Sequence, residues 1–179
     1  MKKCIEYIVF ALEYGPRYNV LNWVDRIISE NPNSRIIITT HCYLDPDGTI
    51  INSQDRFNPE KTITYSDCNN PDKMWEKLIK KHSNIMMVFS GHVSADNIIM
   101  RKYIGDHGNI VSSFLIDAQG AMLTSAMNTL LVVQVNEKNK TMHLTYYSPE
   151  YDACYNEQNN FSFSFADENN PTVGSANQN

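Results

Sequence analysis

Two histidines in this sequence each follow an apolar segment with the composition of a strand. His41 ends the segment RIIITTH, and His92 ends the segment MMVFSGH. Gly91 precedes the second histidine, and glycine lets the backbone approach a bulky or charged group closely. Neutral imidazole is the commonest side-chain ligand of transition metals. The two histidines are therefore candidate metal ligands, with a hydrogen-bonded structural role for each as the alternative.

The segments around these histidines predict a parallel α/β unit. Residues 5–12, 35–40 and 85–89 are rich in β-branched and other apolar residues, which is typical of buried strands. Helical spacing of apolar residues predicts helices over 19–31 and 72–82. Because the carboxyl ends of parallel strands lie along one edge of a sheet, we expect His41 and His92 to be neighbours there.

Each predicted helix has recognisable ends or a recognisable buried face. Asn19 is the expected N-cap of the first helix, and Asn31-Pro32 is its expected end. In the second helix one apolar face is expected to pack against the sheet. That face consists of Met74, Trp75, Leu78 and Ile79.

The second half of the chain has the pattern of antiparallel strands separated by turns. The predicted strands are residues 98–103, 109–117, 129–136, 140–147 and 161–165. The predicted fold class is α/β (α+β), a mixed sheet followed by antiparallel strands, in one domain over residues 1–166. Residues 167–179 have few apolar side chains and are expected to form a disordered tail.

Composition argues against several classes of function. The net charge is −5 and the basic residues are scattered, so no nucleic-acid-binding surface is expected. No apolar window is long enough for a membrane span. The first residues imitate a signal peptide, but Glu6 and Glu13 interrupt the apolar run and no cleavage site follows. The cellular compartment therefore stays open.

Other potentially reactive residues have simpler explanations. His82 lies at the end of a predicted helix, where a cation is favoured by the exposed carbonyl groups. His107 in a turn and His143 on an alternating strand are expected to be structural. Cys42 follows His41 directly, but adjacent strand residues point to opposite faces, which argues against a catalytic Cys-His pair. The four cysteines form no C-x-x-C pair, so no zinc knuckle or redox motif is expected.

Three segments together resemble the C-terminal half of a calcineurin-like metallophosphoesterase, over about residues 7–165. They are FALEYGPRYNVLNWVDRIISENPNSRIIITTHCYLD, MWEKLIKKHSNIMMVFSGHVSADN and YIGDHGNIVSSFLIDAQ. In that family a histidine after a strand and the first histidine of a G-H-x-H motif are ligands of a two-metal centre, and His41 and His92 match these positions. The resemblance implies half of a four-layer α/β/β/α sandwich. It also implies hydrolysis of phosphate mono- or diesters with divalent Zn, Mn or Fe.

The sequence departs from the family pattern in two ways. Ser94 stands where the second histidine of G-H-x-H belongs, and Asp96 is a possible substitute ligand or substrate contact. The family's D-x-H, G-D-x-x-D and G-N-H-[DE] motifs occur nowhere in the 179 residues. We therefore expect a fragment or degenerate member with little activity alone. The alternatives are a catalytically inactive binding or interaction module derived from that fold, and an α/β domain with purely structural histidines.

Overall fold

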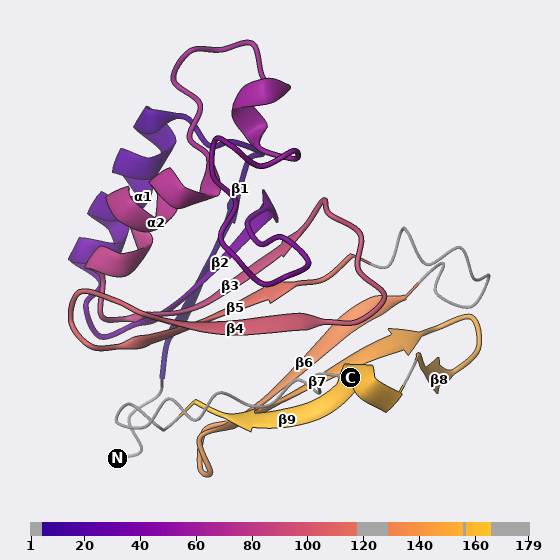
Figure 1. Ribbon diagram of the computed structural model, residues 1–179. Helices are drawn as coiled ribbons and strands as arrows, with labels where there is room; N and C mark the ends of the chain where they lie inside the picture. The colour runs from indigo at the N-terminus through magenta and orange to yellow at the C-terminus, as the bar shows by residue number, and fades with distance from the viewer. Residues whose placement is uncertain (1–4, 118–128, 156, 166–179) are drawn as a thin grey trace.

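The first sheet is built from β1 (Tyr7–Leu12), β2 (Arg35–Cys42), β3 (Ile85–Gly91), β4 (Ile99–Ile104) and β5 (Ile110–Leu115). The computed structural model describes residues 5–117, 129–155 and 157–165. The strand order is β1-β2-β3-β5-β4, and every neighbouring pair is parallel except β5 and β4. Four parallel strands therefore end along the same edge of this sheet, as Figure 1 shows.

Two helices, α1 (Tyr18–Glu30) and α2 (Pro71–Lys77), cover one face of the first sheet (Figure 1). The apolar residues of α1 and α2 form one core cluster with those of the strands. Ile36 and Ile38 of β2 are fully buried in this cluster, as are Val24 of α1 and Met74 of α2. The helices therefore bury one face of the parallel strands that carry the two histidines.

A second sheet lies against the other face of the first sheet (Figure 1). Its strands are β6 (Leu130–Asn136), β7 (Thr141–Ser148), β8 (Ala153–Cys154) and β9 (Asn160–Ser164). All of its strand pairs are antiparallel. Met87 and Phe114 of the first sheet pack in one cluster with Met142 and Leu144 of the second. The described residues thus form three layers, helices on sheet on sheet, in a mixed α+β fold.

The remaining regular elements are short 3₁₀ helices. They are η1 (Pro59–Lys61) in the long connection between β2 and α2, η2 (Ile79–Lys81) one residue after α2, and η3 (Glu157–Asn159) before β9. Within the described part of the chain, no helix has the length and apolar character that a membrane crossing requires.

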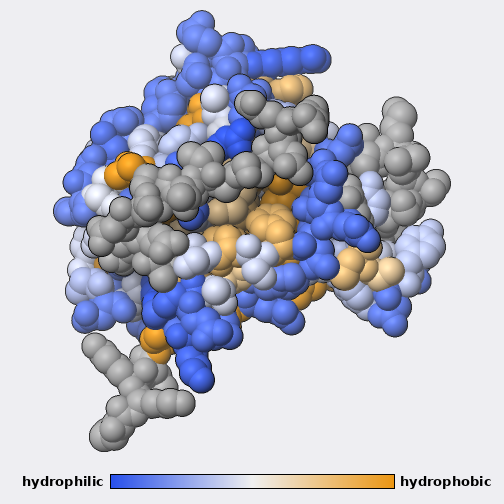
Figure 2. All heavy atoms as spheres, turned by 60° about the horizontal axis from the view of Figure 1, so that its bottom comes forward, coloured by the Kyte–Doolittle hydropathy of each residue, from blue (hydrophilic) through white to orange (hydrophobic). Residues whose placement is uncertain are grey.

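Apolar residues also lie on the surface of the described strands. On the face seen in Figure 2, apolar side chains are visible at the centre and hydrophilic side chains surround them. Val9 of β1 is 58% exposed, and Leu130 and Val135 of β6 are also exposed. Among the described strands β1 lies at one end of the first sheet and β6 at one end of the second. Exposed apolar residues on the edge strands of a sheet favour association with other chains.

The predicted helices exist, but their ends differ from the prediction. Helix α1 begins at Tyr18 with Arg17 as its N-cap residue, so the prediction of Asn19 as the N-cap was wrong. The Glu13 carboxylate accepts hydrogen bonds from the Arg17 backbone and guanidinium, which anchors the earlier start.

The second predicted helix is interrupted where its buried side chains enter the core. Leu78 leaves the α-helical region with φ of −131°, so that α2 ends at Lys77 and η2 follows. Leu78 and Ile79 are nevertheless completely buried and Trp75 packs against the same cluster. The predicted apolar face is therefore confirmed, although one continuous helix does not carry it.

The prediction that the whole second half is antiparallel was wrong for β5. This strand pairs with β3 in parallel and with β4 in antiparallel register. The β4–β5 hairpin folds back so that β5 inserts between β4 and β3, and this topology leaves no trace in hydrophobic periodicity. The predicted tail over 167–179 lies outside the described residues.

Candidate metal centre

Four side chains from four parallel strand ends gather at one edge of the first sheet. Tyr14 follows β1, His41 is the penultimate residue of β2, His92 directly follows β3, and Asp117 follows β5. The edge at the carboxyl ends of parallel strands is the usual place for a ligand in an open α/β sheet.

The predicted juxtaposition of the two histidines is confirmed. His92 Nδ1 lies 3.0 Å from His41 Nε2, and the ring centroids are 4.8 Å apart. At 3.0 Å one ring nitrogen donates a hydrogen bond and the other accepts it, so at least one ring nitrogen of this pair is a free-base acceptor. His41 is exposed and His92 is half-buried.

His92 is held in an unusual backbone conformation. Its φ is +71°, and the Val93 N–H donates a 2.9 Å hydrogen bond to the Gly91 carbonyl oxygen. This three-residue hydrogen bond with positive φ at the central residue is a rare and strained type of γ-turn. Strained residues of this kind cluster at functional sites, where the fold holds a side chain in a set position. The turn directs the His92 ring back toward the end of β2.

Gly91 lies close to the backbone that follows β5. A Cβ atom at this position would lie 3.3 Å from the Ile116 carbonyl oxygen and 3.8 Å from Asp117 Oδ2. The Ile116 N–H also donates to the Ser90 carbonyl oxygen, so β3 and the end of β5 are in close backbone contact. The glycine before the histidine is thus explained by the close approach of the neighbouring chain.

Tyr14 joins the histidine pair to the long β2–α2 connection. Its hydroxyl lies 3.4 Å from His92 Nε2 and 3.1 Å from the Thr62 hydroxyl. The Tyr14 ring also makes an edge contact with the His41 ring at a centroid distance of 5.2 Å. Phe57, from the same connection, presents its ring edgewise to His92. Aromatic rings therefore surround the histidine pair on the loop side.

Burial and the neighbouring imidazole lower the pKa of His92, and Asp117 opposes this effect. His92 is therefore neutral at pH values where an ordinary histidine is partly protonated, and neutral imidazole is the form that binds metal. Burial raises the pKa of Tyr14, so its hydroxyl stays protonated near neutral pH. Near neutral pH this edge of the sheet therefore presents a neutral imidazole at His92 and a neutral hydroxyl at Tyr14.

The other two predicted site residues, Ser94 and Asp96, lie in the connection that follows β3. Ser94 and Asp96 are exposed, and the Asp96 carbonyl oxygen accepts a hydrogen bond from Asn159. Among the described residues, no group of three or more His, Cys, Asp or Glu side chains is arranged to hold a metal ion.

The histidines predicted to be structural have protein partners. His82 Nε2 lies 2.8 Å from an Asp25 carboxylate oxygen, and His107 Nε2 lies 2.9 Å from the Lys81 carbonyl oxygen. His143 contacts the hydroxyls of Ser162 and Thr145. Cys42 is buried while His41 is exposed, as expected for adjacent residues on opposite faces of a strand.

Comparison with known proteins gives little information about the family. The chain is 24% identical over 151 residues to a protein of Bacillus subtilis (strain 168), the "Uncharacterized protein YvnB". This similarity covers 80% of the chain but 10% of the relative, so the chain spans about a tenth of the length of that protein. No family model matches the chain, and no solved structure gives a significant match.

Tyr14 and Asp117 were not identified from the sequence. Each lies two residues beyond the end of its strand, β1 for Tyr14 and β5 for Asp117. The reasoning that placed His41 and His92 at one edge applies equally to β1, and would have identified Tyr14. Asp117 required knowledge that β5 is parallel to β3.

Proposed function

We propose that this chain supplies two ligands, His41 and His92, to the metal centre of a metal-dependent phosphoesterase. The observation that carries the proposal is the 3.0 Å separation of His92 Nδ1 and His41 Nε2 at the carboxyl edge of parallel strands. The resemblance of the surrounding segments to calcineurin-like metallophosphoesterases supplies the class of reaction. A phosphate mono- or diester is the proposed substrate.

The spacing of the two ring nitrogens suits a shared ion. Two nitrogens bound to one ion at about 2.0–2.1 Å lie roughly 2.9–3.4 Å apart when the angle at the ion is about 90–110°. The observed 3.0 Å falls within that range. Binding one divalent Zn, Mn or Fe ion would replace the mutual hydrogen bond of the two ring nitrogens, and each ring would turn so that its nitrogen lone pair points at the ion and not at the other ring.

The surrounding residues have roles that follow from their contacts. When bound, a divalent ion polarises phosphoryl oxygens and lowers the pKa of water. Tyr14 would accept a hydrogen bond from His92 Nε2, leaving Nδ1 free to bind and orienting the ring, as outer partners of metal-binding histidines commonly do.

Arg56 is a candidate anchor for the substrate phosphate. Its guanidinium lies 5.1 Å from the centroid of the Phe57 ring, and that ring contacts His92. Arg56 makes no ion pair with any residue that the structure describes. A guanidinium can bind phosphate through two parallel hydrogen bonds.

The proposed architecture is the α/β/β part of a four-layer α/β/β/α sandwich. Two histidines are fewer ligands than a zinc site requires, and Ser94 is a poor ligand for a transition metal. We propose that further ligands come from residues other than these 179. The isolated chain would then bind metal weakly and turn over substrate poorly.

The test compares the 179-residue chain with a longer protein that also contains the upstream half, if the gene encodes one. Turnover of p-nitrophenyl phosphate and its bis ester is measured with added zinc or manganese. We expect little turnover by the short chain, metal-dependent turnover by the longer one, and loss of most of it in His92→Ala but not in His107→Ala. Failure of His92→Ala to lower turnover would refute the proposed role. Strong turnover by the short chain would refute the need for further ligands.

A second candidate function is a catalytically inactive binding module derived from the same fold. The observation that favours it is the lack, among the described residues, of a third side chain arranged to complete a metal site. In that case the His41–His92 contact is a structural hydrogen bond. Zinc titration separates the two candidates. If the chain is an inactive binding module, the unmodified chain should bind zinc no more tightly than His41→Ala or His92→Ala does.

A further inference from the structure

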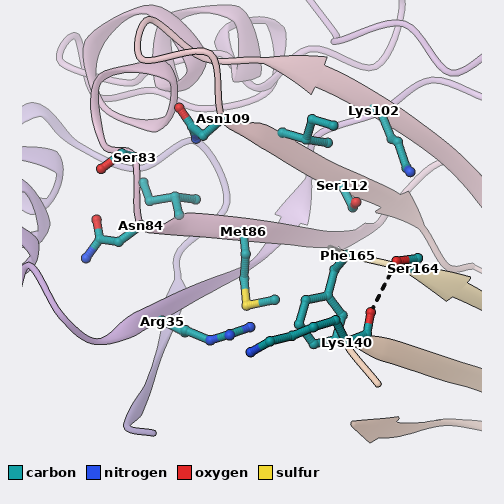
Figure 3. A pocket seen from close by; sticks show the side chains of 12 residues that line it. Arg35, Ser83, Asn84, Met86, Lys102, Asn109, Ser112, Lys140, Ser164 and Phe165 are labelled. Carbon is teal, nitrogen blue, oxygen red and sulfur yellow. Dashed lines mark hydrogen bonds between the residues drawn. The ribbon is translucent and has the colours of Figure 1, made fainter. Parts of the chain in front are cut away.

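We propose that a cavity at the opposite end of the first sheet binds an organic phosphate monoester. The cavity has a volume of about 430 Å³ and lies where several strands begin (Figure 3). Arg35, Ile85 and Ile110, the first residues of β2, β3 and β5, line it, and Phe165 lines it from the end of the second sheet. A volume of this size is typical of small-molecule sites.

Three basic side chains line this cavity and no acidic one does, among the residues that the structure describes. Lys102 extends from β4 on one side, and Arg35 and Lys140 lie on the other (Figure 3). Behind them Glu137 forms ion pairs with Arg35 at 3.1 Å and Lys140 at 2.8 Å. One carboxylate thus balances one of three positive charges, and about two positive charges are left for a ligand.

Lys102 is the most available of the three cations. It forms no hydrogen bond or ion pair with any described residue, whereas Arg35 and Lys140 share Glu137. Lys102 is paired in register with Ser112 of β5, which also lines the cavity. A partly buried ammonium without an anion nearby attracts a charged ligand more strongly than one already paired.

The rest of the lining is partly apolar. Ile85, Met86, Ile110 and Phe165 contribute to the walls. The Arg35 guanidinium lies 5.0 Å from the centroid of the Phe165 ring, within the range of a cation–π contact. A small inorganic anion would leave these apolar walls in contact with water. A ligand with an apolar or aromatic body would cover them and gain free energy from their burial.

The charge of the cavity selects phosphate over carboxylate. A phosphate monoester carries about −1.5 to −2 charges at pH 7, which matches the excess of two positive charges. A carboxylate carries one charge and would leave one cation uncompensated. An aryl or alkyl phosphate monoester therefore satisfies both the charges and the walls.

This cavity is separate from the histidine pair. Ile85 at the start of β3 lines it, whereas His92 follows the other end of the same strand. The seven residues of β3 extend about 20 Å at roughly 3.3 Å per residue. The inference therefore does not depend on the proposed phosphoesterase activity.

The test is calorimetric titration of the 179-residue chain with 1-naphthyl phosphate in the presence of EDTA, which removes any contribution from metal at the histidines. We expect saturable binding of one equivalent. Lys102→Gln should weaken it by about 10-fold, the size expected for one charge-assisted contact to phosphate. The matched control is Lys138→Gln, because Lys138 is exposed between β6 and β7 and does not line the cavity.

Two further comparisons complete the test. His92→Ala should leave the affinity unchanged, and 1-naphthol and 1-naphthoate should bind more weakly than the phosphate. The proposal is overturned if binding is not saturable, if Lys102→Gln binds as tightly as the unmodified chain, or if His92→Ala removes binding. It is overturned equally if naphthol or naphthoate binds as tightly as naphthyl phosphate.

Discussion

His92 Nδ1 and His41 Nε2 lie 3.0 Å apart although 51 positions separate the two residues in the sequence. Two adjacent parallel strands, β2 and β3, make this possible because both end at the same edge of the sheet. Each strand is packed between helices and a second sheet. The relative position of the two rings is therefore set by the core of the fold rather than by a loop.

The lowered pKa of His92 predicts how stability depends on pH. The unfolded chain takes up a proton on this histidine near its ordinary pKa of 6.5, whereas the folded chain does so only at lower pH. Stability should therefore fall as pH decreases from 6.5 through the lowered pKa, because the unfolded state binds more protons. Histidine NMR titration should give a midpoint below 6.5 for His92. A midpoint above 6.5 would contradict the described environment of this side chain.

The strained turn at His92 predicts an unusual order of stability among its variants. Glycine adopts positive φ without steric cost, whereas alanine does not. His92→Gly should therefore be more stable than His92→Ala by about 1 kcal/mol, although glycine normally destabilises ordered structure. Urea denaturation of the two variants measures the difference. Equal stability, or greater stability of the alanine variant, would mean that the backbone at position 92 is not under strain.

Gly91 should tolerate a side chain poorly. A Cβ atom would lie 3.3 Å from the Ile116 carbonyl oxygen. This backbone segment is held in place because the Ile116 N–H donates a hydrogen bond to the Ser90 carbonyl oxygen. We expect Gly91→Ala to lower the free energy of unfolding by about 1 kcal/mol or more. The same substitution should also weaken zinc binding, since a shift of β3 moves His92. Unchanged stability and zinc affinity would show that the contact between β3 and the end of β5 adjusts easily.

The Tyr14 hydroxyl should support metal binding without being a ligand. Removing it in Tyr14→Phe keeps the ring contacts but takes away the partner of His92 Nε2. Loss of such an outer partner commonly lowers metal affinity by about 10-fold or more. Zinc affinity of Tyr14→Phe, measured by calorimetry, should fall accordingly. Tyr18→Phe is the control, because Tyr18 is exposed on α1 and should leave the affinity unchanged.

Sequence reasoning could predict the positions of His41 and His92 because apolar strand composition and parallel connectivity are local signals. It could not predict that β5 runs parallel to β3, since this depends on how the β4–β5 hairpin folds back. Asp117 was missed for the same reason. The interruption of the second helix at Leu78 was missed because helix propensity gives no sign of it. The backbone conformation at Leu78 goes with the complete burial of its side chain in the core.

Zinc binding by the 179-residue chain tests the central claim most directly. Calorimetric titration at pH 7.5 should show one weakly bound equivalent. His41→Ala and His92→Ala should each lower the affinity by at least about 10-fold, and the double variant should bind little worse than either, because two ligands of one ion act as a unit. His107→Ala should bind zinc as the unmodified chain does. Zinc affinity that is unchanged in both His41→Ala and His92→Ala would contradict the assignment of these histidines to a shared metal site.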